Sequence, residues 1–267
     1  MTKRIDRSDP AFAPGFRIRT VGVVRTPFHE RFGIPRQPGL VPDARGRLEL
    51  LPPWNRAEAV AGLKGFSHLW LLFWFHGNRE MESGLTVRPP RLGGNVRVGV
   101  FASRSPFRPN PIGLSAVALE RIEQGVDGPV LHLRGVDLLD GTPILDVKPY
   151  VPYADTIDGA KGGFAEEGIV RLPVSFSPAA RRALACRTDV DEVERVIVAV
   201  LGLDPRPGYR RDEPDSGRVL GMRLYDFDLR WRVVGGAVEV LNLAPCSQDA
   251  RPPGSVSYTH LSCRRPS

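Results

Sequence analysis

The sequence contains few cysteines and no long apolar run. Its three cysteines, Cys186, Cys246 and Cys263, are far apart and odd in number. This pattern predicts neither a disulfide framework nor a paired CxxC metal site, and it favours a reducing cytoplasm. The longest apolar run, Leu69 to Phe75, is far shorter than the ~18 residues of a membrane span. Residues 1–15 lack the apolar core of a secretory signal. We therefore expect a cytoplasmic protein with no membrane partner.

Common cofactor and metal fingerprints are also missing. No GxGxxG follows a strand-like run, and the chain has no Walker loop and no HExxH. The five histidines are scattered along the chain, so no metal is expected. A doubly wound dinucleotide-binding fold and a zinc hydrolase are therefore not predicted.

The charge of the chain is unevenly distributed. Residues 1–110 hold 18 Lys and Arg against 8 Asp and Glu, whereas residues 111–267 hold 19 against 22. A basic first half favours a polyanionic partner such as nucleic acid. The alternative is a genome of high GC content that prefers arginine, which the ratio of arginine to lysine also fits.

Short strand-like segments separated by Gly and Pro dominate the first 155 residues. One short helix is expected at Arg56–Leu63, with Asn55 as N-cap and Glu58 completing a capping box. The run HLWLLFWFHG is typical of a strand covered on both faces. This density of strands, with little helix, predicts a β-barrel or a sandwich and not a βαβ sheet. The expected strands are Arg17–Arg25, Arg47–Leu51, Ser67–Phe75, Arg97–Phe101, Gly113–Ile122, Val130–Val136 and Ile144–Lys148.

Residues 165–244 have a different pattern, that of a small α+β domain. Two helices are expected. Pro178–Cys186 is capped by Ser177, and Val190–Leu201 is capped by Asp189 and carries one apolar stripe. A hairpin follows, formed by Leu220–Val234, a Gly235-Gly236 turn and Ala237–Leu243. Its first strand changes phase at Tyr225-Asp226, which predicts a bulge. Residues 245–267 show no periodicity and are expected to be a disordered tail.

The most distinctive segment is LGGNVRVGVFASRSPFRPNPIGLS, from Leu92 to Ser115. Five arginines and no acidic residue occur from Arg88 to Arg108, and three prolines restrict the backbone near its end. We expect a stiff loop that points Arg104, Arg108 and Asn110 in fixed directions and holds an anion. The alternative is a solvated basic loop between two strands.

Four further segments carry polar residues at turns or strand ends. They are GIPRQPGL at 33–40, His76-Gly77 after the apolar strand, DLLDGTPILDVKPY at 137–150 and DPRPGY at 204–209. Each has a structural explanation as a turn, a strand end or a helix stop when it is taken alone. Their occurrence together favours a functional site.

With their flanking residues, these motifs resemble the TsaA-like, TrmO family. The similar segments are GVVRTPFHERFGIPRQPGL, GFSHLWLLFWFH, VRPPRLGGNVRVGVFASRSPFRPNPIGLS, DLLDGTPILDVKPYVP and DPRPGYRR…LYDFDLRWRV, in order over residues 16–243. The resemblance implies an S-adenosylmethionine-dependent methyltransferase that N6-methylates N6-threonylcarbamoyladenosine next to the anticodon of tRNA. It also implies a mainly β fold, with a donor-binding β-barrel domain at 16–155, an α+β domain at 165–244 and a homodimer.

The resemblance also implies roles for individual residues. It places the catalytic cluster on Asp204, Arg206 and Tyr209. The acceptor side is expected, from the unopposed arginines and the stiff loop and not from the resemblance, at Arg88, Arg91, Arg108 and Asn110. Asp204 could act as a general base or as a structural clamp. Two alternatives stay open: a donor-sensing or RNA-binding barrel without catalysis, and a methyltransferase with another acceptor. All donor residues precede Asp155, so a fragment ending there is expected to keep some donor binding. These residues are Pro35, Arg36, Gln37, His76, Gly77, Arg104, Leu114, Asp137, Leu138, Leu139 and Asp140.

Overall fold

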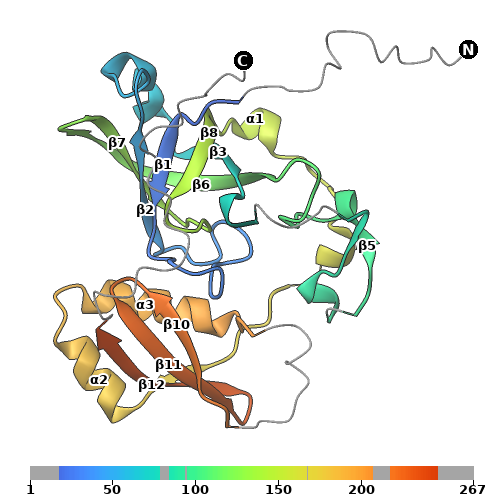
Figure 1. The fold of residues 1–267 in the computed structure, drawn as a ribbon, viewed down its shortest axis with the longest axis vertical. Helices are drawn as coiled ribbons and strands as arrows, with labels where there is room; N and C mark the ends of the chain where they lie inside the picture. The colour runs from blue at the N-terminus through green and yellow to red at the C-terminus, as the bar shows by residue number, and fades with distance from the viewer. Residues whose placement is uncertain (1–17, 79–83, 94, 167, 207–216, 246–267) are drawn as a thin grey trace, which may run out of the picture.

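A computed structural model of the chain describes residues 18–78, 84–93, 95–166, 168–206 and 217–245. It shows a closed antiparallel β-barrel with a smaller α+β region beneath it (Figure 1). The mainly β prediction is confirmed, and the barrel is the correct choice over the sandwich. No helix within the described ranges is both long and apolar enough to cross a membrane. The N-terminal segment 1–15, Tyr209 and almost all of the expected tail lie outside the described residues.

Six strands form the barrel in the order β1-β2-β7-β6-β3-β8. The barrel closes because β1 pairs with both β2 and β8, so that Gly22 lies opposite Leu50 on one side and Ile144 on the other. Inward-facing side chains such as Leu48 and Leu131 are fully buried, so the interior is a packed core and not a channel. The strands are β1 (Gly22–Arg25), β2 (Arg45–Leu50), β3 (His68–Trp74), β6 (Ile112–Gly125), β7 (Gly128–Arg134) and β8 (Thr142–Pro149).

Strand β3 buries one face and covers the other only in part. Leu69, Leu71 and Phe73 point into the barrel and are buried, whereas the alternate residues stay partly exposed. On the outer face Trp70 packs against the Tyr150 ring, with centroids 5.6 Å apart. The expectation of a strand covered on both faces is therefore wrong, because aromatic contacts of this kind account for the apolar outer residues.

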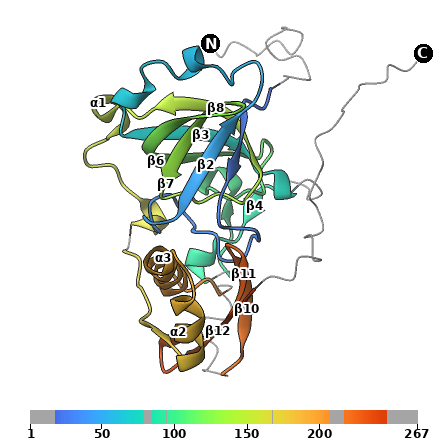
Figure 2. The same ribbon diagram turned by 90° about the vertical axis from the view of Figure 1, so that its left-hand side faces the viewer.

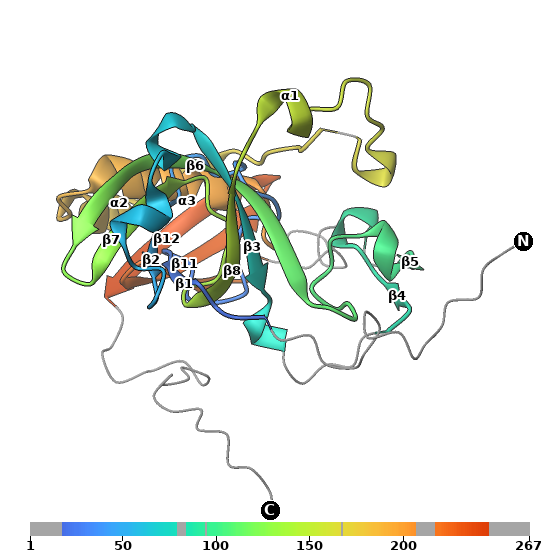
Figure 3. The same cartoon turned by 90° about the horizontal axis from the view of Figure 1, so that it is seen from above.

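Residues 84–111 form an arm at one side of the barrel (Figure 3). The expected strand Arg97–Phe101 is confirmed only over two of its residues. Only β5 (Val98–Gly99) is extended, and it pairs with β4 (Thr86–Val87) in a separate two-stranded sheet. Two 3₁₀ turns accompany these strands, η5 (Pro90–Leu92) and η6 (Val100–Ala102). The segment lies outside the barrel, and within residues 97–101 only Val100 is buried.

The expected helix at residues 56–63 is also wrong. The chain forms two 3₁₀ turns, η2 (Ala57–Val60) and η3 (Leu63–Gly65), with left-handed Gly62 (φ 79°) between them. Asn55 is not a cap, because its side-chain Nδ2 donates to the Asp127 carbonyl at 2.6 Å. Neither turn contains a buried residue, and Val60 and Leu63 pack against the core only in part, so little packing is available to stabilise a longer helix. Three further short turns are η4 (His76–Asn78), α1 (Pro152–Asp155) and η7 (Gly163–Ala165).

The α+β region places two helices against a four-stranded sheet of order β10-β11-β12-β9 (Figure 2). Strand β9 is parallel to β12, a pairing that the sequence did not reveal. The Ser177 cap is confirmed, since its hydroxyl accepts from the Ala180 amide at 3.1 Å. Asp189 makes no capping bond and instead pairs with Arg187. The elements are β9 (Val174–Phe176), α2 (Pro178–Ala185), α3 (Val190–Gly202), β10 (Leu220–Leu224), β11 (Phe227–Val234) and β12 (Ala237–Pro245).

The expected bulge at Tyr225-Asp226 is a turn. Leu224 pairs directly with Phe227, so the chain reverses there and β10 and β11 are separate strands. Tyr225 takes the left-handed conformation (φ 51°), which Asn and Gly adopt more readily. The missing Asn-Gly signal explains why the pattern was interpreted as one strand. The sheet does contain an irregularity, but between Arg230 and Trp231, where the register with β12 shifts.

Candidate functional site

One cavity of about 720 Å³ opens at the barrel rim, a size usual for small-molecule sites. Four segments meet there: the loop after β1, the end of β3, the arm with the start of β6, and the turn before β8. Residues distant in sequence therefore face one space. Its lining includes Arg31, Pro35, Arg36, Gln37, Phe73, Phe75, His76, Gly77, Phe101, Ser103, Arg104, Arg108, Asn110, Leu114, Ser115, Asp137, Leu138, Leu139 and Thr142.

The part of the arm that carries Arg104 and Arg108 is held by hydrogen bonds within itself and by one across the cavity. Arg108 Nη1 donates to the Ser103 carbonyl at 3.1 Å, and Ser103 Oγ donates to the Val100 carbonyl at 3.0 Å. Arg104 Nη1 donates to Gln37 Oε1 at 2.6 Å. The bond between Arg104 and Gln37 joins the arm to the loop after β1, and so connects the two basic sides of the cavity.

A carboxylate lies on another wall of the cavity. Ser115 is almost fully buried, and its hydroxyl donates to Asp137 Oδ1 at 2.6 Å. Burial raises the pKa of Asp137 to about 6, although the Ser115 hydrogen bond and the Arg104 charge act in the opposite direction. A desolvated carboxylate of this kind is suited to a cationic ligand group, which would restore the lost solvation.

Aromatic and small residues form the apolar wall. Phe73 and Phe75 meet edge to face, with centroids 5.1 Å apart. A Cβ at Gly113 would lie 2.2 Å from the Phe73 ring, so only glycine fits beside it. Leu114 is half exposed to the same space. With Asp137 and the arginines, this wall suits a ligand that combines an aromatic ring with groups of both charges.

The DPRPGY segment begins just after α3. Asp204 is buried and left-handed (φ 48°). Its carboxylate accepts from Arg206 through Nε at 2.8 Å and Nη2 at 2.9 Å, and from the Arg206 backbone amide at 3.3 Å. Neither residue lines the cavity. Among the described residues, no three His, Cys, Asp or Glu side chains gather in a way that could hold a metal ion.

Comparison with known proteins covers both parts of the chain. Residues 23–156 match the family model described as tRNA-methyltransferase O N-terminal domain, and residues 169–246 match the TrmO C-terminal domain. The chain belongs to the TrmO family. A relative described as tRNA (adenine(37)-N6)-methyltransferase, from Escherichia coli strain K12, is 45% identical over 232 residues, which are 86% of this chain and 98% of the relative.

Two Pseudomonas aeruginosa proteins extend the TrmO comparison. One, described as a putative S-adenosylmethionine-dependent methyltransferase RcsF, is 49% identical over 219 residues, which are 80% of this chain and 91% of that protein. The other is a solved structure, the crystal structure of TrmO from Pseudomonas aeruginosa. It matches with a TM-score of 0.71 at 40% identity over 86% of this chain and 98% of that one.

Most residues that the TrmO resemblance assigns to the donor lie together. All except Asp140 line the cavity. Asp140 instead accepts from the Thr26 amide at 3.0 Å and lies near Arg25 and His29. Arg108 and Asn110 also line the cavity, whereas Arg88 and Arg91 are exposed on the arm outside it.

Several lining residues were missed from the sequence. Ser115 carried a usable signal, because a polar residue stands at an inward-facing position of an otherwise apolar alternation in β6. Arg31 and Phe101 carried no such signal, since both lie in irregular segments whose direction depends on the folded chain. Phe73 and Phe75 were interpreted only as core residues of a strand.

Proposed function

We propose that this chain is an S-adenosylmethionine-dependent methyltransferase that methylates N6 of N6-threonylcarbamoyladenosine next to the tRNA anticodon. The observation that carries the proposal is the composition of the cavity: one desolvated carboxylate, arginines on other walls and an aromatic surface. Relatives described as tRNA (adenine(37)-N6)-methyltransferase support the reaction and the acceptor base.

The residues present fit the methyl donor. Arg104 or Arg36 pairs with its carboxylate, and Asp137 pairs with its ammonium. Backbone groups near Leu114 and Leu138 read the edge of its adenine, and the aromatic wall covers the ring face. When bound, the donor supplies a methyl group on an electrophilic sulfonium. The part of this chain in the transfer would be to place the acceptor N6 in line with that methyl. As the N6–CH3 bond forms, the S–CH3 bond breaks, the donor leaves as the neutral thioether, and the N6 proton passes to solvent at the cavity mouth.

The acceptor nitrogen carries a carbamoyl group, which makes it a weak nucleophile and a more acidic one. Arg108 and Asn110, both at the cavity, stabilise negative charge that develops on the carbamoyl oxygen. We assign Asp204 the clamp role and not that of the base, because its carboxylate is engaged by Arg206. Arg206 is the other half of this clamp, and we assign Tyr209, which lies outside the described residues, to the acceptor. No metal takes part in the proposed reaction.

The assembly completes the proposal. We divide the chain into a donor-binding domain at 16–155, a domain carrying DPRPGY at 165–244 and a tail, and we place the reaction in the cytoplasm. Arg88 and Arg91 contact tRNA phosphates. A homodimer is supported by apolar side chains beside the cavity: Leu85 is 89% exposed and Phe101 80% exposed, and a second copy would cover them.

Donor binding by an Arg104→Ala variant tests the proposal. Calorimetry should show that S-adenosylmethionine binds the wild type and binds the variant more weakly by ~1.5–3 kcal/mol, the usual contribution of a charged hydrogen bond. Arg97→Ala is the control, because Arg97 contacts Thr86 on the arm and does not line the cavity. Unchanged affinity in Arg104→Ala would remove that residue from the pocket.

Mass spectrometry of tRNA nucleosides identifies the acceptor. A strain without the gene should lack the methylated form of threonylcarbamoyladenosine and accumulate the unmethylated one. An unchanged nucleoside profile, together with normal donor binding, would favour a donor-sensing barrel. Loss of a different methylated nucleoside would favour another acceptor.

A further inference from the structure

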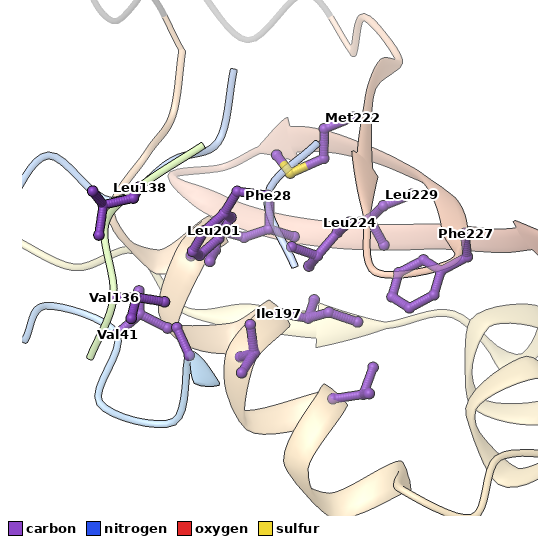
Figure 4. Close-up of a cluster of buried hydrophobic side chains, with 14 of the residues drawn as sticks. Phe28, Val41, Val136, Leu138, Ile197, Leu201, Met222, Leu224, Phe227 and Leu229 are labelled. Atoms are coloured by element: carbon purple, nitrogen blue, oxygen red, sulfur yellow. The ribbon is translucent and has the colours of Figure 1, made fainter. Parts of the chain in front are cut away.

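The long loop between β1 and β2 belongs to the barrel by sequence but packs into the α+β region. Phe28 is 2% exposed and forms a β-bridge with Leu224 of β10. The backbone amide of Tyr225 donates to the Pro27 carbonyl at 2.9 Å. Figure 4 shows Phe28 among side chains of the second region, beside Leu201 and Leu224. The start of the loop is therefore part of the core of both regions.

The next residues of the loop continue this contact. The Phe32 ring stacks on Trp231 of β11, with centroids 6.5 Å apart and planes at 14°. Gly33 is left-handed (φ 90°), and a Cβ there would lie 2.8 Å from Met222 Sδ. Trp231 is completely buried and Met222 nearly so. The loop thus rests on two strands whose residues lie about 190 positions later in the chain.

The same loop then turns directly into the cavity. Only Ile34 separates Gly33 from Pro35, and the residues from Ile34 to Gln37 all line the cavity. Gln37 is fixed in turn by Arg104. Farther along, the Leu40 carbonyl accepts from Arg171 Nη2 at 2.7 Å, which ties the end of the loop to the second region as well. Both flanks of the donor-facing residues are therefore held from outside the barrel.

We propose that Met222, Leu224 and Trp231 are positioning residues for the methyl donor. None of them lines the cavity. They act by keeping the loop in the conformation in which residues 35–37 face the donor. Without that support the loop samples other conformations, and the apparent donor affinity falls with the populated fraction of the competent one. The inference rests on the donor pocket of the proposed function.

Variants of the full chain separate positioning from general stability. Phe32→Ala removes the loop side of the contact, and Met222→Ala removes part of the sheet side. Phe32→Tyr keeps the ring and should restore binding. Leu184→Ala is the matched control for Met222→Ala, because Leu184 is as buried as Met222 in the same region but lies in α2, which packs on β12, α3 and β9 (Figure 2).

Thermal unfolding, the Kd for S-adenosylmethionine and steady-state methylation are measured for each variant. Phe32→Ala and Met222→Ala should raise the donor Kd and KM about tenfold, as expected if the competent loop falls to roughly a tenth of the population, with little change in kcat at saturating donor. Leu184→Ala should lower the Tm by about as much as Met222→Ala does, and it should leave the donor Kd unchanged.

Wild-type donor affinity in both Phe32→Ala and Met222→Ala would overturn the inference and leave the proposed function intact. Equal losses of donor affinity in Leu184→Ala and Phe32→Ala would also overturn it, because they would reflect stability alone. Absence of donor binding in the wild type would overturn the proposed function and this inference with it.

Discussion

The ionised carboxylate of Asp137, on a wall of the cavity, lowers the stability of the folded chain. Its carboxylate is desolvated in the cavity, and the hydrogen bond from Ser115 does not compensate fully, so the pKa is raised to about 6. A carboxyl whose pKa is higher in the folded than in the unfolded chain favours folding when it is protonated. This contribution is complete below the unfolded pKa and is lost as the pH rises through about 6.

Asp137→Asn should therefore stabilise the protein and weaken donor binding. At pH 8 the free energy of unfolding should rise by about 1–3 kcal/mol, since two pKa units correspond to ~2.7 kcal/mol before screening by cavity water. The gain should shrink as the pH falls through 6 and vanish near pH 4. Chemical denaturation across this pH range, with calorimetric donor titrations, measures both effects.

Asp146→Asn is the control for this prediction. Asp146 is an exposed acid of the neighbouring strand β8, paired with Lys148 at 2.8 Å, so its removal should change stability by less than ~1 kcal/mol and leave donor binding unchanged. A less stable Asp137→Asn protein at pH 8 would contradict the argument. It would mean that hydrogen bonds and nearby positive charge offset the desolvation of the Asp137 carboxylate completely.

At the scale of elements, the arm is the most separate part of the described chain. It has its own two-stranded sheet, and its arginines at 88 and 91 are exposed outside the cavity. Because Arg88 and Arg91 lie outside the cavity, we expect them to contribute little to donor binding. Their role is expected to be contact with the phosphates of a long substrate, for which the release of counterions is the main source of affinity.

Replacing both Arg88 and Arg91 by Gln should make tRNA binding less sensitive to salt. The slope of log affinity against log salt should fall by up to about two, roughly one for each lost phosphate contact. Donor affinity should not change. Arg181→Gln with Arg182→Gln, on α2, is the control pair. An unaltered slope in the arm variant would mean that the charge asymmetry of the chain is only compositional.

Elements whose apolar residues repeat with a helical or strand period could be predicted from the sequence. Elements that depend on contacts with distant residues could not. Helix α3 was predictable because its stripe, which includes Val196 and Ile197, is buried as expected. The turn at Tyr225-Asp226 was missed because it lacks the Asn-Gly or Asp-Gly pair of a two-residue hairpin. The parallel partner β9 was missed because three residues carry no measurable alternation.

The cavity was predictable to the extent that motifs carry it. The family resemblance assigned ten donor-site residues that the structure places around one cavity. It did not explain why residues so far apart in the sequence lie together. Asp140 was included with its neighbours, yet it turns away to the Thr26 amide, because adjacent residues of a tight turn point in different directions. Which side chains support the lining from behind could not be predicted, since those contacts join distant parts of the chain.

At the scale of the whole molecule, the barrel and the α+β region form one core. Ion pairs join them at the surface, from Asp43 to Arg195 at 3.1 Å and from Arg45 to Glu192. Such pairs each contribute little. The larger contribution comes from Phe28 and its buried partners, because the burial of apolar area is the dominant favourable term in folding.

This continuity changes the expectation for a fragment of residues 16–155. The order of the motifs along the chain predicts that the fragment keeps some donor binding, but removal of the second region would expose Phe28 and Phe32. We now expect a soluble fragment to retain the circular dichroism of a β-barrel and to bind S-adenosylmethionine at least about tenfold more weakly than the full chain. Calorimetry on both proteins decides this. A fragment with full affinity would show that the loop is ordered by the barrel alone.

Because the chain is synthesised from its N-terminus, the core shared by the two regions also determines when the pocket can form. All six barrel strands have been synthesised by Pro149, so the barrel can close once they leave the ribosome, while the rest of the chain is still being made. The loop that carries Pro35, Arg36 and Gln37 must wait for β10 and β11, which are made near the end. A growing chain therefore has a barrel long before it has a finished pocket. The first molecule able to capture the methyl donor is one whose synthesis is almost complete.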